Sequence, residues 1–230
     1  MNLKVSPFYI LAFLLLLFLV HEIHDWMHVL AVRGTCHCWP VRLFGSWEIC
    51  GSPSAGQHAI IDVAGPLINV LLYVAAWNLL DPENSADEYS LGVALLFAPL
   101  PWNDLIAAFS GGGEITDCIR WMQKHGPQSN RSFAGGLGLV IQLALILPPL
   151  VRAFRRLPGY KGRLIAFPLF LLLPVWLDKH WNQLLNQWFI PAGSTLWHGY
   201  IVVGAWFVLL LAGFLLTRRH LKGLITELSL

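Results

Sequence analysis

Apolar residues form long blocks along the chain, and short polar segments separate these blocks. Six blocks approach or exceed the length of about 20 residues that a helix needs to cross the hydrocarbon core of a bilayer. They cover residues 7–32, 59–80, 90–109, 135–154, 164–181 and 196–216. The pattern predicts an all-α, multi-pass integral membrane protein with about six transmembrane helices.

Hydrophobic residues make up 56% of the 230 residues and charged residues only 12%. This balance excludes a soluble domain and makes the lipid bilayer a partner of the chain. The net charge of +2 is too small to indicate a nucleic-acid partner. The first apolar block resembles a signal peptide, but only Lys4 precedes it and no small-residue cleavage site follows, so we expect a retained helix.

The distribution of lysine and arginine favours a cytoplasmic N-terminus, because cytoplasmic loops carry an excess of these residues. In that orientation nine of the fifteen basic residues lie inside: Lys4, Arg152, Arg155, Arg156, Lys161, Arg163, Arg218, Arg219 and Lys222. The remaining six lie outside: Arg33, Arg42, Arg120, Lys124, Arg131 and Lys179.

The loop after the first block, residues 34–57, mixes aromatic and β-branched residues with glycine and proline. This composition predicts two short strands joined at Gly45, a β-hairpin-like loop. Such a hairpin either presents an edge to an extended peptide or only connects two helices. The loop also holds Cys36, Cys38 and Cys50, which leaves open a Cys-x-Cys metal site or a loop disulfide.

A run of titratable residues, from His21 to His28, continues the first apolar block. On a helix His21, His24, Asp25 and His28 share one face, because they are spaced i, i+3, i+4 and i+7. His24 and His28 stand one turn apart, which lets two imidazoles bind one zinc ion. Asp25 then takes the place of the general base. In a second register His21 and Asp25 bind the metal with Glu22 as the base, but imidazole pairs suit zinc better.

The third apolar block is broken by Pro99 and Pro101 just before Asp104. A carboxylate beside an unwound turn in a membrane needs a partner, and a metal held by two histidines would supply one. Glu114 and Asp117 follow a run of three glycines and are rival ligands. A short amphipathic helix is expected from there to about His125.

Three elements occur in the same order as in the site-2 protease family of intramembrane zinc metalloproteases, which this chain resembles over about residues 10–120. They are His24-Asp25-Trp26-Met27-His28, Ala64-Gly65-Pro66-Leu67-Ile68-Asn69, and Leu100-Pro101-Trp102-Asn103-Asp104 with Gly111-Gly112-Gly113 beyond. The first is an H-D-x-x-H variant, in which aspartate stands where the family has glutamate.

The resemblance implies one Zn²⁺ per chain, bound by His24, His28 and Asp104, with Asp25 as the general base. Asn69 would align the unwound backbone of a membrane-protein or transmembrane-peptide substrate. Four polar side chains are available to orient the ligands: His21, Glu22, His58 and Asn103.

The expected function is therefore that of an intramembrane zinc endopeptidase, which hydrolyses a peptide bond in or near a membrane-spanning segment. Residues 1–125 would form the metalloprotease-like core, and residues 126–230 would add three scaffold helices. Three alternatives stay open: a catalytically inactive protease-like protein, an ion or proton transporter that uses the polar cluster, and a di-iron membrane hydroxylase. The last is considered because His24-x-x-x-His28 also fits a di-iron box.

Overall fold

The computed structural model describes residues 2–3, 5–123, 131–157, 159, 162–190 and 196–226. Its helices are α1 (Pro7–Cys36), α2 (Ala55–Leu79), α3 (Ala86–Phe97), α4 (Pro101–Phe109), α5 (Glu114–Gln123), α6 (Arg131–Arg156), η1 (Gly162–Ala166), α8 (Phe167–Phe189), α9 (Leu196–Thr217) and η2 (Arg218–Gly223). Its strands are β1 (Asn2–Leu3), β2 (Val41–Leu43), β3 (Ser46–Glu48) and β4 (Ile225–Thr226). Lys4, Lys124, His125 and Lys161 lie outside the described residues, as does the expected boundary between residues 125 and 126.

Six helical segments of the described chain are long and apolar enough to cross a membrane, which confirms the expected fold class. They are Pro7–Cys36, Ala55–Leu79, Ala86–Phe109, Ser132–Arg156, Arg163–Phe189 and Trp197–Gly223. Each contains most of one apolar block of the sequence.

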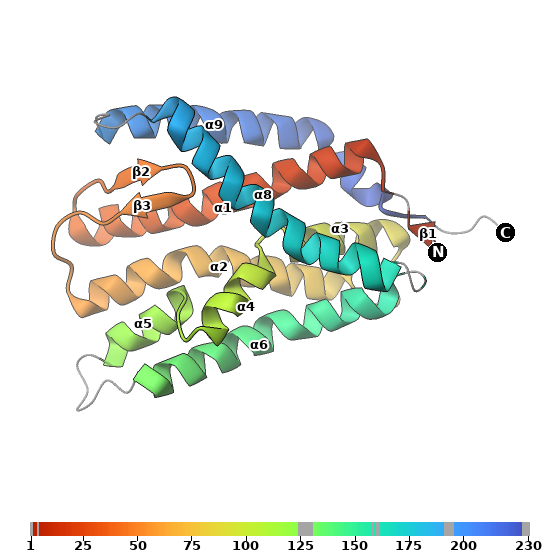
Figure 1. Ribbon diagram of the computed structural model, residues 1–230, viewed down its shortest axis with the longest axis horizontal. Helices are drawn as coiled ribbons and strands as arrows, with labels where there is room; N and C mark the ends of the chain where they lie inside the picture. Colours follow the sequence, from red (N-terminus) through yellow and green to blue (C-terminus); the bar gives the residue numbers. More distant parts are fainter. Residues whose placement is uncertain are drawn as a thin grey trace.

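The long helices run roughly along one axis of the molecule (Figure 1). α1 packs against α2 on one side and against α9 on the other, and α2 in turn packs against α6. α8 crosses this arrangement obliquely. The β2–β3 hairpin lies at one end of the helices, whereas β1 and β4 pair near the opposite end.

The loop after α1 forms the expected hairpin, with its turn at Phe44 and Gly45. β2 and β3 are antiparallel, and Arg42 lies opposite Trp47. Gly45 adopts a φ of 64°, a left-handed conformation that glycine reaches without a steric penalty. The prediction of two short strands joined at this glycine is confirmed.

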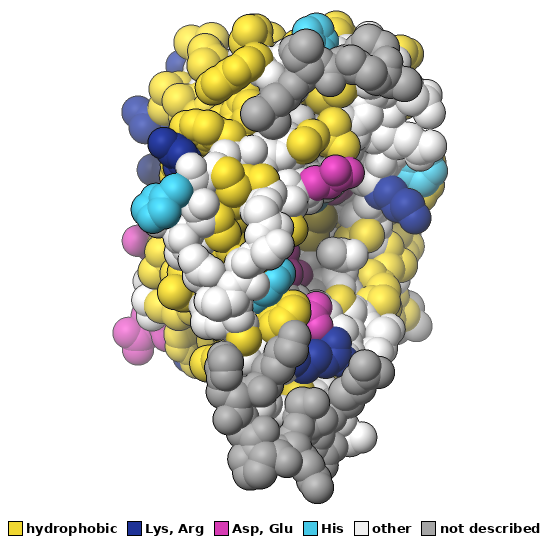
Figure 2. All heavy atoms as spheres, turned by 90° about the vertical axis from the view of Figure 1, so that its left-hand side faces the viewer, with side chains coloured by type: hydrophobic (Ala, Val, Ile, Leu, Met, Phe, Trp, Pro, Cys, Tyr) yellow, Lys and Arg dark blue, Asp and Glu magenta, His cyan; other side chains and the backbone are white. Residues whose placement is uncertain are grey.

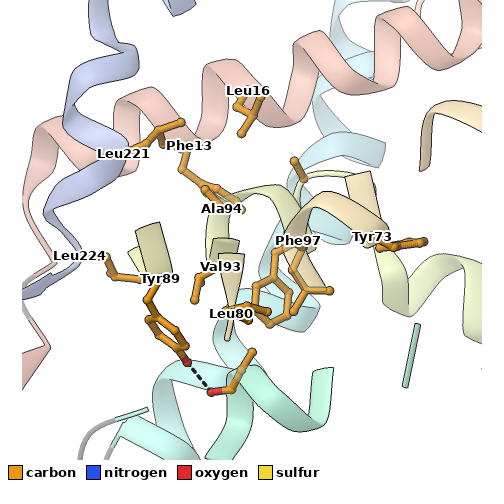
Figure 3. Packing of buried hydrophobic residues seen from close by; sticks show 14 of the residues in the cluster. Phe13, Leu16, Tyr73, Leu80, Tyr89, Val93, Ala94, Phe97, Leu221 and Leu224 are labelled. Carbon is orange, nitrogen blue, oxygen red and sulfur yellow. Dashed lines mark hydrogen bonds between the residues drawn. The ribbon is translucent and has the colours of Figure 1, made fainter. Parts of the chain in front are cut away.

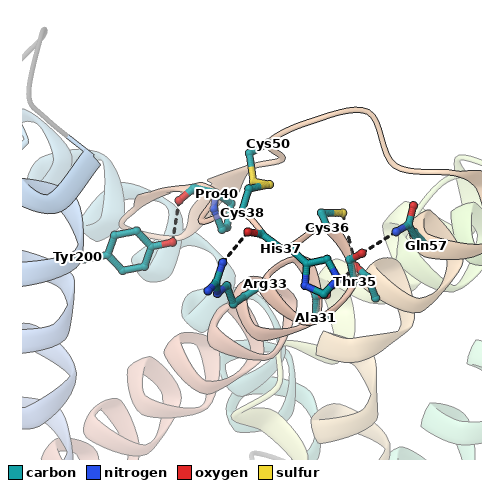
Figure 4. The surroundings of a disulfide bond; sticks show 10 residues. All are labelled: Ala31, Arg33, Thr35, Cys36, His37, Cys38, Pro40, Cys50, Gln57 and Tyr200. Atoms are coloured by element: carbon teal, nitrogen blue, oxygen red, sulfur yellow. Dashed lines mark hydrogen bonds between the residues drawn. A yellow bond between two sulfur atoms is a disulfide. The ribbon is translucent and has the colours of Figure 1, made fainter.

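A disulfide closes the base of the hairpin (Figure 4). It joins Cys38 to Cys50, while Cys36 is a free thiol. Of the two alternatives for the loop cysteines, the structure therefore contains the disulfide. Tyr200 of α9 donates a hydrogen bond of 2.7 Å to the carbonyl oxygen of Pro40, which ties the hairpin to the helix beside it.

Buried side chains from α1, α2, α3, α4, α6 and η2 form the main hydrophobic core (Figure 3). Phe13, Leu80, Phe97 and Leu221 belong to this core, each at most 5% exposed. Tyr89 donates a hydrogen bond of 2.6 Å to the carbonyl oxygen of Ala153, so its buried hydroxyl group is satisfied.

The third span breaks where the prolines predicted a break. α3 ends at Phe97, and α4 begins at Pro101. Between them Leu100 adopts a φ of 55°, a left-handed conformation that is uncommon for a residue other than glycine. The change of direction places Asp104 in the first turn of α4.

Candidate metal centre

α1 places two histidines on one face of the helix. The helix is capped at its start by Ser6, whose hydroxyl accepts a hydrogen bond from the backbone N–H of Tyr9, and it continues through the whole histidine run. The Nε2 atoms of His24 and His28 lie 3.2 Å apart. The helical spacing has thus brought the two imidazoles together, as the sequence predicted.

Glu114 completes a group of three donors. Its Oε1 atom lies 3.0 Å from His28 Nε2 and 3.1 Å from His24 Nε2. Among the residues that the structure describes, these three form the only group of three or more potential metal ligands whose donor atoms all lie within 4.8 Å of one another. The structure therefore joins the rival acid Glu114 to the histidines.

The start of α5 explains why Glu114 reaches this position. Glu114 is the first residue of α5, after the turn that contains Gly111 and Gly113, both in left-handed conformations. Burial alone would raise the pKa of the Glu114 carboxyl group, but its hydrogen bonds and charge interactions with His24 and His28 lower the pKa to about 2. The side chain is therefore ionised at neutral pH, as a metal ligand must be.

The hydrogen bond made by the second ring nitrogen of His28 supports a metal-binding role. His28 Nδ1 lies 2.6 Å from the carbonyl oxygen of Ile61. Because a carbonyl can only accept, Nδ1 donates this hydrogen bond, and Nε2 is the ring nitrogen that faces His24 and Glu114. Metal-binding histidines usually have such an outer hydrogen bond.

The distances also fit a zinc ion. Ligand distances of about 2.0–2.1 Å in a tetrahedral site place the donor atoms about 3.3 Å apart. The three donor–donor distances here are 3.0 to 3.2 Å. A small increase in these three distances would make room for an ion that binds all three donor atoms.

Gly65 provides the space for this group. A Cβ atom on Gly65 would lie 2.6 Å from His24 Nε2 and would overlap His28 Nε2 even more closely. Both distances are shorter than atoms in contact tolerate, so a side chain at this position would displace the histidines. The glycine of the Ala64-Gly65-Pro66 motif is therefore required by the geometry of the candidate site.

The three donors lie beside a cavity of about 520 Å³ between the helices. His24 and Glu114 line it together with Asn69, Asp104 and Gln142, and the hairpin contributes Trp47. Figure 2 shows the hairpin end of the molecule, where the surface is hollowed and acidic side chains lie at the hollow. The expected substrate-binding residue Asn69 is thus on the wall of the same cavity.

Asp104, the third ligand that the resemblance implies, lines the same cavity but lies apart from the three donors. Its Oδ2 atom accepts a hydrogen bond of 3.0 Å from the Tyr73 hydroxyl group and one of 3.4 Å from Asn69 Nδ2. It lies outside the three-ligand group of the described residues. The reason is that α4 directs Asp104 toward α2, while the chain reaches the histidines only ten residues later, at Glu114.

Asp25 and Glu22 are held by Arg42, a residue that was expected to lie in an external loop. Arg42 Nη1 donates a hydrogen bond of 2.9 Å to Asp25 Oδ2, and its Nη2 donates one of 2.6 Å to Glu22 Oε2. Arg42 is completely buried and also donates to the carbonyl oxygen of Ser46. Asp25 lines the cavity, but its carboxylate is engaged by this guanidinium group. In the alternative register, Glu22 is likewise engaged.

His21 connects the candidate site to α8. Its Nδ1 atom lies 2.8 Å from Asp178 Oδ1, and its Nε2 atom lies 4.0 Å from Asp25 Oδ2. Asp178 belongs to the part of the chain that was expected to be scaffold. Asn186 of the same helix bonds both the N–H and the carbonyl group of Phe44, at 2.9 Å each. α8 therefore positions both the histidine run and the hairpin.

The remaining candidates lie further from the three ligands. Asp117 forms an ion pair of 2.6 Å with Arg120, one turn along α5. The His58 ring stacks on Trp121, with ring centroids 4.0 Å apart. Asn103 is exposed and lines the cavity.

Sequence reasoning missed three residues that shape the site: Arg42, Tyr73 and Trp47. Trp47 stacks on the His28 ring, with centroids 5.0 Å apart. A signal was present for Arg42. It is the only basic residue in the predicted strands, and Glu22 and Asp25, which lie about one turn apart on the first helix, need a cation.

Comparisons of the chain with protein-family models, with curated proteins and with solved structures find no match. The likeness to site-2 proteases therefore rests on the three sequence motifs and stays a prediction.

Proposed function

We propose that the protein is an intramembrane zinc-dependent endopeptidase, which hydrolyses a peptide bond in or near a membrane-spanning segment of its substrate. One observation carries the proposal. Two histidines and a glutamate place three donor atoms within hydrogen-bond distance of one another, beside a cavity between helices that are long enough to cross a membrane.

His24, His28 and Glu114 would hold the zinc ion, which supplies Lewis acidity toward the scissile carbonyl and toward water when it is bound. The chain itself supplies the other requirements. Asn69 and Gln142 present amide groups to the cavity, and these can hydrogen-bond the backbone of an unwound substrate. The hairpin lines the cavity with Gly45, Ser46 and Trp47, so an extended peptide can lie along it.

The metal is tested by elemental mass spectrometry on the detergent-purified protein. We expect one zinc per chain in the wild type and a loss of zinc in His24→Ala, His28→Ala and Glu114→Gln. Asp117→Asn is the matched control, because Asp117 lies on the same short helix but pairs with Arg120. Wild-type protein without zinc would refute the proposal, and two irons per chain would favour the di-iron hydroxylase.

Peptidase activity is tested in lipid nanodiscs. The probe is a mixture of synthetic apolar peptides of about 25 residues, each with a helix-weakening Gly-Ser or Asn-Pro pair near its centre. Cleavage is followed by mass spectrometry of the products. We expect new peptide ends near the weakened pair, which are absent with His28→Ala.

A catalytically inactive, protease-like protein is the second candidate. The ion pair between Asp25 and Arg42 favours it, because the residue in the position of the general base is engaged by a buried cation. One zinc per chain without cleavage of any peptide in the mixture would support this alternative over the endopeptidase.

A further inference from the structure

The group that accepts the proton of the attacking water is a separate question from the metal ligands. Two carboxylates line the cavity beside His24 and Glu114: Asp25 and Asp104. We propose that Asp104, rather than Asp25, is the general base, and this assignment rests on the proposed endopeptidase function. Asn69 and Tyr73 are the residues that position it.

The hydrogen-bond partners separate the two carboxylates. Asp25 is fixed through Oδ2 by Arg42, which is fully buried and also binds Glu22. Asp104 contacts only neutral donors among its described side-chain partners, the Tyr73 hydroxyl group and the Asn69 amide. Both of these bonds use Oδ2, which leaves Oδ1 to accept a hydrogen bond from water.

The location of Asp104 suits a base better than a ligand. A general base does not bind the metal. It accepts a proton from the water that lies between the two, and its oxygen atom is about 2.6–3.2 Å from the oxygen of that water. It should therefore lie in the same cavity as the ligands but outside their group of donor atoms. Asp104 meets both conditions.

The backbone before Asp104 adds an independent observation. Leu100 holds a left-handed conformation that costs a residue with a side chain on the order of 1 kcal/mol or more. Strained conformations of this kind cluster at functional sites. Leu100 lines the cavity itself and immediately precedes α4, whose first turn carries Asp104.

The proton balance follows from these positions. Asp104 accepts one proton from a water molecule in the cavity as the water oxygen bonds to the carbonyl carbon of the substrate. The same proton then passes to the amide nitrogen as the C–N bond breaks. One peptide bond and one water molecule give one carboxyl and one amino group, and Asp104 returns to its ionised form.

The test compares Asp104→Asn with Asp25→Asn for zinc content, thermal unfolding and peptide cleavage. We expect Asp104→Asn to keep one zinc per chain and to lose about 10²–10⁴-fold in cleavage rate, the usual contribution of a general base. Loss of zinc in Asp104→Asn would make Asp104 a ligand and overturn the assignment. Wild-type cleavage by Asp104→Asn, or loss of cleavage with zinc intact in Asp25→Asn alone, would also overturn it.

Tyr73→Phe provides a second variant, in case Asp104→Asn does not fold. It removes one hydrogen bond to Oδ2 and leaves an apolar ring of the same shape. We expect kcat to fall about tenfold, in line with the loss of one hydrogen bond to a charged group, with KM and zinc content unchanged. An unchanged kcat would count against the assignment. Wild-type protein that lacks zinc or does not cleave identifies a failure of the proposed function instead.

Discussion

Gly65 of α2 lies directly against the ring nitrogens of His24 and His28. Replacing it with alanine would push a methyl group into the three-ligand group. We expect Gly65→Ala to weaken zinc binding by about 100-fold or more, at the upper end of the effect of disturbed ligand geometry. Competition with a chelator of known zinc affinity measures the change.

Gly56→Ala is the matched control for this prediction. Gly56 lies in the same helix, is exposed, and has open space where its Cβ atom would be. Both substitutions favour the helical backbone by similar amounts, up to about 1 kcal/mol. Equal zinc affinity in the two variants would show that Gly65 does not define the site.

Arg42 is the residue whose loss should most disturb the histidine face of α1. Arg42→Gln would leave Glu22 and Asp25 buried without their cation. Breaking a buried ion pair in this way usually costs about 3–5 kcal/mol, so we expect a loss of that size in the free energy of unfolding. It is measured by denaturant titration in detergent micelles.

Arg120→Gln is the comparison for Arg42→Gln. Arg120 pairs with Asp117, but the two side chains are 36% and 44% exposed. Exposed pairs contribute about 0–1 kcal/mol, so this variant should be nearly as stable as the wild type. Similar losses in both variants would contradict a structural role of the buried cluster.

At the scale of single residues, the sequence predicted the two donors that are close together in the chain. His24 and His28 are four residues apart, so helix geometry alone brings them together. The third donor is 86 residues further on, and the sequence left Asp104, Glu114 and Asp117 as competitors. Only the path of the chain between α4 and α5 distinguishes them. The same holds for Arg42, whose burial depends on how the hairpin folds back over α1.

Among the elements, the hairpin has the most connections to the site. The disulfide closes its base, Arg42 fixes its middle to α1, and Asn186 holds its turn through two hydrogen bonds. Composition predicted the two strands and Gly45. It could not choose between a disulfide and a metal site for the cysteines, because both use the same residues.

Removal of the disulfide should therefore destabilise the protein. The two cysteines are 12 residues apart, and a closed loop of that length restricts the unfolded chain by about 3 kcal/mol. We expect Cys38→Ser and Cys50→Ser each to lower the free energy of unfolding by about this amount. Treatment of the wild type with a reductant should have the same effect.

Cys36→Ser is the control for the disulfide, because Cys36 is a free thiol two residues before Cys38. It should unfold like the wild type, with and without reductant. Equal stability of all three variants would mean that Cys38 and Cys50 are not joined in the protein.

For the whole molecule, the apolar blocks were sufficient to predict the six long helices. They could not predict which helices meet, because lipid and helix interior both favour the same apolar residues. The contact between His21 and Asp178 illustrates this limit. It joins the first span to the fifth, although the fifth was expected to be scaffold.

Two features at opposite ends of the molecule predict its orientation. We expect the end with the disulfide hairpin to face an oxidising compartment, because disulfides are rare in the cytosol. Near the other end, where β1 pairs with β4, lie the last turns of α6 and the helix η2. These two segments carry the basic residues Arg152, Arg155, Arg156, Arg218, Arg219 and Lys222. Arg42 is buried in ion pairs and no longer counts as an external charge. Both features favour a cytoplasmic N-terminus.

This orientation would place the mouth of the candidate metal centre on the side away from the cytosol, since the hairpin lines the cavity. The prediction is tested with one introduced thiol, Gly56→Cys or Lys222→Cys, both exposed positions, in a background in which the free cysteines are removed by Cys36→Ser and Cys118→Ser. A membrane-impermeant maleimide should label Gly56→Cys in intact cells and Lys222→Cys only after permeabilisation. The reverse pattern would place both the hairpin and the cavity mouth in the cytosol, where disulfides are rare, and the hairpin would then depend on its contacts through Arg42, Asn186 and Tyr200.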